Sequence, residues 1–160
     1  MIKTFLSAAS IVALLPTCLP SFAQTRTPGL GATFGTMLSK VAPGANAKPT
    51  DDAIRSALQA TVNQVNKSMP MTVDAITRVD NITVSPTSAK FTYNATLDLP
   101  LKDIQAENLL ARTKPTLLKG VCTSPDMKIF LDRGVTVGYS YRAKDGAFAG
   151  KIEISPADCR

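Results

Sequence analysis

The feature that most constrains the fold is a segment enclosed by two cysteines, Cys122 and Cys159. Just after the first of them, Pro125 suits the first position of a helix, because proline lacks the N–H that would be unpaired there. Residues 135–142 and 148–154 then alternate apolar and polar side chains, which is the pattern of strands with one buried face. The sequence therefore predicts a short helix and a β-hairpin between the two cysteines.

The beginning of the chain has the pattern of a bacterial signal peptide. A charged start precedes an apolar run over residues 5–15, and Ser21 and Ala23 fit the small-residue rule for cleavage. We predict that residues 1–23 are removed during export and that the remaining chain is periplasmic or secreted. No later apolar run reaches the roughly 18 residues of a membrane span, so no transmembrane segment is expected in the mature chain.

Export changes what the three cysteines can do. Cys18 leaves with the signal peptide, and Cys122 and Cys159 remain as an even pair in an oxidising compartment, where a disulfide is expected. Two unlinked thiols are the alternative. A second alternative is lipidation of Cys18, but Pro16 and Thr17 stand where the lipoprotein signal favours small residues.

Residues 24–49 are rich in Pro, Gly, Ala and Thr, which favours a flexible linker. Phe34, Met37, Leu38 and Val41 nevertheless follow helical spacing. The segment can therefore also dock as a short amphipathic turn on its own domain, on a partner or on a membrane surface. The glycines in the segment disfavour a helix, so the linker is the preferred interpretation.

A long amphipathic helix is predicted to open the folded domain. Thr50 is placed as an N-cap, two aspartates follow it in the first turn, and Pro70 prevents continuation of the helix. Between these signals, an apolar stripe recurs at helical spacing over residues 50–69.

Strands and further helices follow in order. Strands are predicted near residues 78–85 and 91–99, joined by a turn, and Asp103 can begin a helix that Pro115 kinks or ends. With the hairpin near the C-terminus, residues 50–160 are predicted to form a single α+β domain. We expect an antiparallel sheet of about four strands, arranged as two hairpins, with two or three helices covering one face and one disulfide.

The net charge of +6 is not concentrated in the predicted domain. Residues 24–49 carry three basic side chains and no acidic one, whereas residues 50–160 hold 14 basic and 12 acidic residues. A surface for nucleic acid needs clustered Lys and Arg. The sequence therefore predicts no nucleic-acid partner.

The chain contains no histidine, which narrows the chemistry open to it. A Ser-His-Asp triad, a Cys-His pair and histidine-based metal sites are excluded. No glycine-rich phosphate loop follows a strand either. We predict no catalytic residues, no metal and no cofactor. A carboxylate pair at Asp74 and Asp80 is the remaining route to an enzyme.

Polar residues gather just before and within the first long strand, at Asp74, Thr77, Arg78 and Asp80. In one interpretation, Arg78 pairs with the neighbouring acids and fixes how the chain enters the sheet. In the other, this cluster is a ligand-binding site in which Thr77 and Arg78 donate hydrogen bonds to an anionic or peptide ligand.

Several short stretches resemble a group of small exported bacterial proteins that are mostly described as uncharacterised. They are residues 69–74 (MPMTVD), 77–80 (TRVD), 91–94 (FTYN), 121–127 (VCTSPDM), 139–141 (YSY) and 154–159 (ISPADC). The resemblance covers roughly residues 50–160 and implies an α+β fold without an assigned activity. The segment between the cysteines is also similar in layout to the disulfide-bonded pilotins of type II secretion, which bind a helix of the secretin.

These observations predict an exported, non-enzymatic module of the bacterial envelope that binds a protein or a peptide. The binding surface would be the sheet or the groove beside the helix at residues 50–69. A pilotin-like secretion adaptor is one alternative, and a small enzyme with a carboxylate site near Asp74 and Asp80 is another. A third is a structural envelope component anchored through residues 24–49. The sequence makes no prediction of the oligomeric state.

Overall fold

The structure is a computed structural model that describes residues 34–37 and 49–160. The predicted signal peptide, its cleavage site and most of the predicted linker lie outside the described residues. Within the described part, no helix is both long and apolar enough to cross a membrane.

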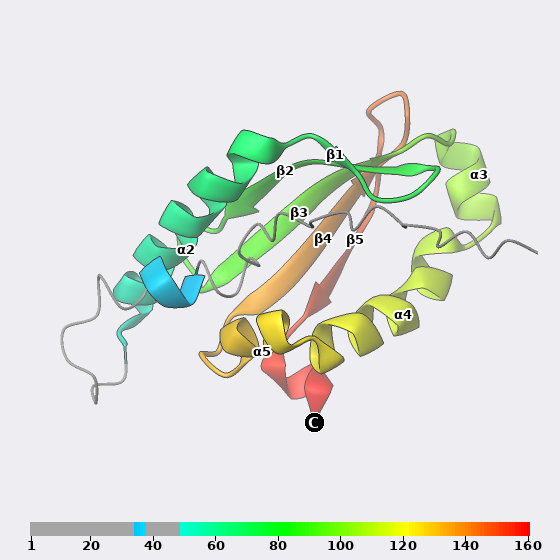
Figure 1. Cartoon of the computed structure of the whole chain (residues 1–160). Coiled ribbons are helices and arrows are strands. Elements are labelled where there is room, and N and C mark those ends of the chain that lie inside the picture. The colour runs from blue at the N-terminus through cyan, green and yellow to red at the C-terminus, as the bar shows by residue number, and fades with distance from the viewer. Residues whose placement is uncertain (1–33, 38–48) are drawn as a thin grey trace, which may run out of the picture.

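The described residues form an α+β fold around a mixed five-stranded sheet in the order β1-β2-β3-β4-β5 (Figure 1). The strands are β1 (Met71–Thr72), β2 (Thr77–Val84), β3 (Lys90–Leu97), β4 (Thr136–Arg142) and β5 (Phe148–Ile154). Neighbouring strands are antiparallel except β3 and β4, which are parallel.

The expectation of about four strands in an antiparallel sheet is therefore wrong in two respects. The additional strand is β1, whose two residues pair with Val79 and Arg78 of β2. The parallel pair arises because the chain between β3 and β4 is a long helical crossover, which returns β4 to the end of the sheet where β3 begins. Each predicted hairpin is correct by itself, but the crossover decides how they join.

Helix α2 (Asp51–Val65) forms where the sequence predicts it. The Thr50 side chain accepts a hydrogen bond from the backbone N–H of Ala53 at 3.2 Å, and the apolar stripe packs on β2. Just beyond the helix, the Asn66 side chain donates to the carbonyl of Ile82 and accepts from its N–H, both at 2.8 Å. Asn66 thereby pairs with the outer edge of β2 where β1 does not reach.

Three helices make up the crossover: α3 (Leu101–Ala106), α4 (Leu109–Thr123) and α5 (Pro125–Leu131). Pro115 was expected to kink or end a helix, but it does not end one, because α4 continues through it. Pro115 and Ala111 are both exposed, so water can reach the Ala111 carbonyl that loses its partner. Ser124 caps α5 as predicted by accepting from the N–H of Met127.

The predicted disulfide is confirmed: Cys122 is bonded to Cys159 across 37 positions of sequence. Cys122 lies in the last turns of α4, and Cys159 ends the 3-10 helix η2 (Pro156–Cys159) that follows β5. The bond therefore links α4 to the segment that follows β5, and this segment lies beside α5 (Figure 1).

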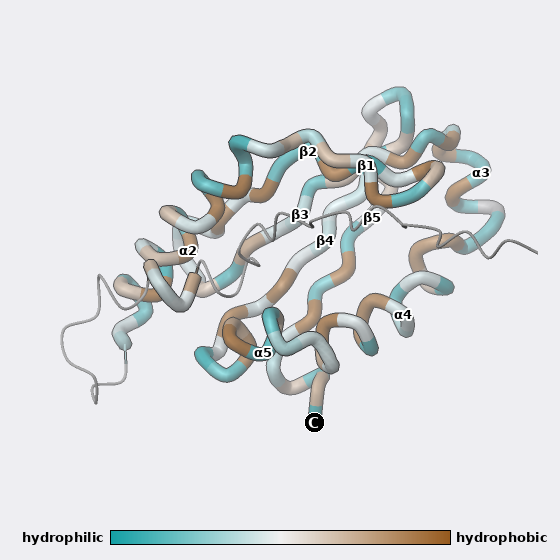
Figure 2. The backbone as a smooth tube through the Cα atoms, viewed as in Figure 1, coloured by the Kyte–Doolittle hydropathy of each residue, from teal (hydrophilic) through white to brown (hydrophobic). Residues whose placement is uncertain are grey.

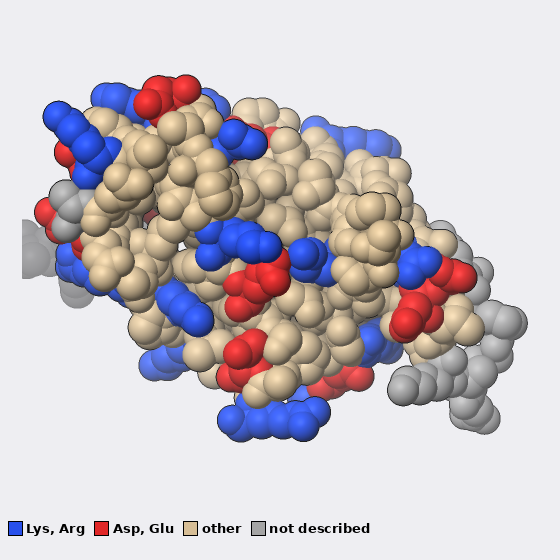
Figure 3. Space-filling view, turned by 180° about the vertical axis from the view of Figure 1, so that it is seen from behind, with Lys and Arg blue, Asp and Glu red and all other residues tan. Residues whose placement is uncertain are grey.

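The helices α2, α4 and α5 lie on one side of the sheet (Figure 1). Strand residues that face them are mostly buried, and hydrophilic and hydrophobic residues alternate along β5 (Figure 2). The opposite side of the sheet carries Thr, Asn and Ser together with paired charges. Lys90 and Lys151 both contact Glu153 there, at 3.1 and 3.0 Å. Figure 3 shows positive and negative side chains intermingled on the back of the molecule.

Candidate functional site

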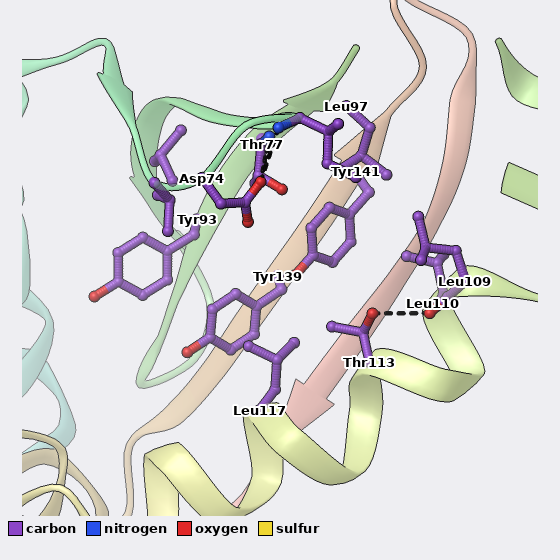
Figure 4. A pocket seen from close by; sticks show the side chains of 14 residues that line it. Asp74, Thr77, Tyr93, Leu97, Leu109, Leu110, Thr113, Leu117, Tyr139 and Tyr141 are labelled. Atoms are coloured by element: carbon purple, nitrogen blue, oxygen red, sulfur yellow. Dashed lines mark hydrogen bonds between the residues drawn. The ribbon is translucent and has the colours of Figure 1, made fainter. Parts of the chain in front are cut away.

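A groove opens on the helix side of the sheet, between its middle strands and α4 (Figure 4). Its cavity volume is about 250 Å³. The groove exists because α2 packs mainly on β2, whereas α4 packs on β5 and α5. The two helices cover the outer strands and leave part of β3 and β4 without a helix above them.

Tyrosines form the floor of the groove. Tyr93 of β3 and Tyr139 of β4 are register partners, and their rings stack with centroids 5.2 Å apart. Tyr141 lies two residues further along β4 on the same side. In the described part of the chain, the hydroxyls of these tyrosines form no hydrogen bond with another residue. Every buried polar side-chain atom of the described residues does have a hydrogen-bond partner, so these hydroxyls are not buried. The hydroxyls therefore open to the groove.

The surroundings of these rings suppress ionisation. Burial raises the pKa of Tyr139 and that of Tyr141 to about 12, with smaller contributions from Tyr141 and Asp74 respectively. Burial also raises the pKa of Tyr93, and the carboxylate of Asp126 adds to that shift. At neutral pH the floor offers three uncharged hydroxyls on an otherwise apolar surface.

The wall opposite the floor comes from α4. The side chains of Leu110, Thr113 and Leu117 project from one face of this helix toward the groove (Figure 4). Gly150 on β5 allows α4 to lie this close, since a Cβ there would come within 2.5 Å of the Leu110 Cδ1 atom. Its φ of +145° also disfavours other residues. Only Val121 of α4 is fully buried, so the helix presents half-exposed leucines to the groove.

The rim on the β2 side is the loop between β1 and β2. Met71, Val73 and Ile76 are the exposed large apolar side chains here, with exposed fractions of 52%, 59% and 38%. Val73 and Ile76 line the groove together with Asp74 and Thr77. The apolar lining thus continues to the surface of the molecule.

Three of the four residues predicted as a ligand-binding cluster, Asp74, Thr77 and Arg78, line a second, polar cavity of about 320 Å³, and Asp80 does not. Asp74 and Thr77 also lie at the groove, where Asp74 Oδ1 accepts the N–H groups of Ile76 at 2.9 Å and Thr77 at 2.8 Å. Arg78 and Asp80 lie on the opposite side of the sheet. There Arg78 Nε is 2.7 Å from Asp80 Oδ1, and Thr96 donates to Asp80 Oδ2 at 2.6 Å.

The arrangement suits binding of apolar groups. Its lining is almost wholly apolar, with a few hydroxyls and one carboxylate at fixed positions. In the described ranges, no group of three or more Cys, Asp or Glu residues is placed to hold a metal ion.

Sequence reasoning did not find the wall residues on α4. The predicted binding surface was the sheet or the groove beside the helix at residues 50–69, and the cavity lies over the sheet but is bounded by α4. The sequence contained one signal for this wall, namely four leucines at positions 109, 110, 117 and 118 of a helix that contains a proline. All four are only half-buried in the structure.

Comparison with known proteins places the chain in a family. Residues 52–148 match the family described as "Domain of unknown function (DUF8479)". The chain belongs to this family. No curated protein matches its sequence.

Solved structures share the fold of this DUF8479 protein at low sequence identity. A crystal structure of a putative secreted protein from Pseudomonas aeruginosa has a TM-score of 0.60 and 16% identity, covering 73% of this chain and all of the other. The type 2 secretion system pilotin from Vibrio vulnificus has a TM-score of 0.55 and 13% identity, covering 69% of this chain and 94% of the pilotin. The type II secretion system pilotin from Vibrio cholerae gives 0.53 and 11%, covering 68% and 94%.

Proposed function

We propose that this DUF8479 protein is an exported, non-enzymatic binding module of the bacterial envelope that holds an apolar segment of another protein in the groove between β3, β4 and α4. Export is proposed to follow cleavage near Ala23, which gives a periplasmic or secreted protein. The single observation that carries the proposal is the groove, which has a tyrosine floor and an apolar rim that continues to exposed Met71 and Val73.

An apolar segment should bind this groove favourably, because binding removes from water the leucine, valine and tyrosine surface of the groove and the apolar surface of the segment itself. Burial of apolar area contributes roughly 25 cal/mol per Å², and aromatic rings with a polar tip are favoured at protein interfaces. The free hydroxyls of Tyr93, Tyr139 and Tyr141 add hydrogen-bonding positions that can fix the register of the bound segment.

A pilotin-like secretion adaptor is the more specific form of this proposal. It is supported by the fold that the chain shares with two pilotins and by the disulfide, which fixes α4 as the groove wall. Pro16 and Thr17 stand before Cys18 where a lipoprotein signal favours small residues, so we propose a form without a lipid anchor.

The enzyme alternative has less support. Asp74 lies at the groove, and Asp80 lies on the other side of the sheet in contact with Arg78 and Thr96. Paired-carboxylate catalysis requires both groups to flank one bond of the substrate.

Photo-cross-linking inside the producing bacterium tests the proposed function. A photoreactive phenylalanine analogue replaces Leu117 in the groove wall in one variant, and Thr83, exposed on the polar side of the sheet, in the matched control. We expect a discrete cross-linked protein from position 117 and none from position 83. Equal products at both positions, or none at position 117 in the exported folded chain, would contradict the proposal.

A further inference from the structure

Among the described residues that line the groove, Asp74 alone carries a charge near neutral pH. Its exposed carboxylate lies at the rim, beside the ring of Tyr141 in the view of Figure 4. An apolar segment entering the groove therefore passes a fixed negative charge.

The position of this carboxylate is set by the backbone. Asp74 Oδ1 accepts the N–H groups of Ile76 and Thr77, and the N–H of Val73 donates to the carbonyl of Thr77 at 2.9 Å, which closes the β1–β2 turn. The hydrogen bond from Ile76 is the main cause that lowers the pKa of Asp74, so the side chain is ionised at physiological pH.

No cation of the described residues neutralises Asp74. Arg78 and Lys144 line the neighbouring polar cavity together with Asp74, but neither forms an ion pair with it. Arg78 contacts Asp80 instead. The electrostatic complement of this groove is a positive charge.

We infer that the protein segment held in the groove carries a Lys or Arg beside its apolar side chains, and that Asp74 is the residue that selects it. This inference rests on the proposed function. The basic side chain contacts the exposed carboxylate of Asp74 while the apolar side chains lie against the tyrosine floor and the leucines of α4. An acidic segment of equal hydrophobicity is disfavoured by repulsion from the same carboxylate.

Asp74 also has a structural role in its turn, and Asp74→Asn separates the two roles. Asparagine keeps the Oδ1 acceptor for the N–H groups of Ile76 and Thr77, while it removes the charge and replaces the second oxygen by an NH2 donor. Glu153→Gln on the opposite side of the sheet is the matched control, because it changes the net charge by the same amount far from the groove.

The experiment uses octylammonium and octanoate as probes, since each joins the same apolar chain to an opposite charge. Binding of each to the processed ¹⁵N-labelled chain is followed by NMR shifts of the groove residues and of the Ile76 and Thr77 amides. At low salt we expect octylammonium to bind roughly fivefold more tightly than octanoate, as for a solvent-accessible ion pair, and the difference to shrink at high salt. Asp74→Asn should reduce the preference below about twofold, and Glu153→Gln should keep it.

The outcomes distinguish the two proposals. If both probes bind the groove equally in the unaltered protein, or if Asp74→Asn keeps the full preference, Asp74 does not select a cation and the inference fails while the apolar groove stands. If neither probe shifts the groove resonances, the groove does not take apolar chains, which contradicts the proposed function itself.

Discussion

The two ends of the β3–β4 pair differ in what covers them. Where the strands begin, Phe91 lies under Phe130, with ring centroids 4.9 Å apart. Phe34, from a helical turn at residues 34–37, stacks on Phe130 with ring centroids 4.5 Å apart. All three rings have no exposed surface. Two residues along each strand, the helices of the described residues leave Tyr93 and Tyr139 half-buried, and both form the floor of the groove.

The same strands therefore provide a sealed core at one end and an open apolar surface at the other. We call these the sealed end (Phe34, Phe91, Phe130) and the open end (Tyr93, Tyr139, Tyr141). Within the open end, Tyr93 and Tyr139 are half-buried, and Tyr141 is 6% exposed. An edge-to-face contact between Phe91 and Tyr93, with ring centroids 5.6 Å apart, joins the two. The stability of the fold should therefore depend on the sealed end, and binding should depend on the open end.

The largest effect is expected at the sealed end. Phe130→Ala removes a fully buried ring from contact with Phe34 and Phe91, and we expect a loss of about 4 kcal/mol in the free energy of unfolding, measured by urea denaturation. Phe148→Ala is the control, because Phe148 is 58% exposed and should change the stability by less than about 0.5 kcal/mol. Similar losses in the two variants would show that no sealed core exists there.

The next effect concerns the bond that holds the groove wall. Replacing both Cys122 and Cys159 by Ser should lower the free energy of unfolding by about 3 kcal/mol, because a loop of 37 positions is no longer closed in the unfolded chain. Hydrogen exchange should also increase in α4 more than in α2, which the bond does not constrain. An unchanged exchange pattern in α4 would mean that its position does not depend on the disulfide.

A smaller effect distinguishes two positions of α4. Val121 is 3% exposed beneath the helix, so Val121→Ala should cost about 2 kcal/mol of unfolding free energy. Leu117 faces the groove and is only half-buried, and Leu117→Ala should cost less than about 1 kcal/mol despite removing more atoms. A larger loss of unfolding free energy for Leu117→Ala than for Val121→Ala, in thermal or urea unfolding, would contradict the assignment of Val121 to the core and of Leu117 to the groove.

The tyrosines of the open end should affect stability only at high pH. Because burial raises the pKa of Tyr139 and that of Tyr141 from 10 to about 12, the full stabilisation is present below pH 10 and is lost as the pH rises toward 12. Absorbance at 295 nm should accordingly show no phenolate in the folded protein at pH 10.5, and its appearance there would contradict the burial of these rings.

Much of this organisation follows from local patterns in the sequence. The alternation at Phe91 and Tyr93 correctly predicts which side of β3 faces the helices, and the cap at Thr50 predicts α2. The even cysteine pair predicts the disulfide. These signals come from neighbouring residues or from the chemistry of export.

What covers each end could not be predicted in the same way. Phe91 and Tyr93 occupy the same phase of one strand, and only the placement of α5 and Phe34 makes the first sealed and the second open. That placement depends on the direction in which the crossover returns the chain, which also makes β4 parallel to β3. The separation of Asp80 from Asp74 and Thr77 has a related cause, because alternate positions of β2 face opposite sides of the sheet, and Asp80 bonds Thr96 on the polar side.

Quenching of tyrosine fluorescence by bromo-octanol tests whether the open end takes up an apolar chain. The chain has three tyrosines and no tryptophan, and all three tyrosines line the groove, so the emission reports the open end alone. We expect saturable quenching in the unaltered protein and in Thr83→Arg on the polar side, and its loss in Leu117→Arg, where a charged side chain enters the groove. Quenching that does not saturate, or that is equal in the two variants, would contradict an open apolar groove over these rings.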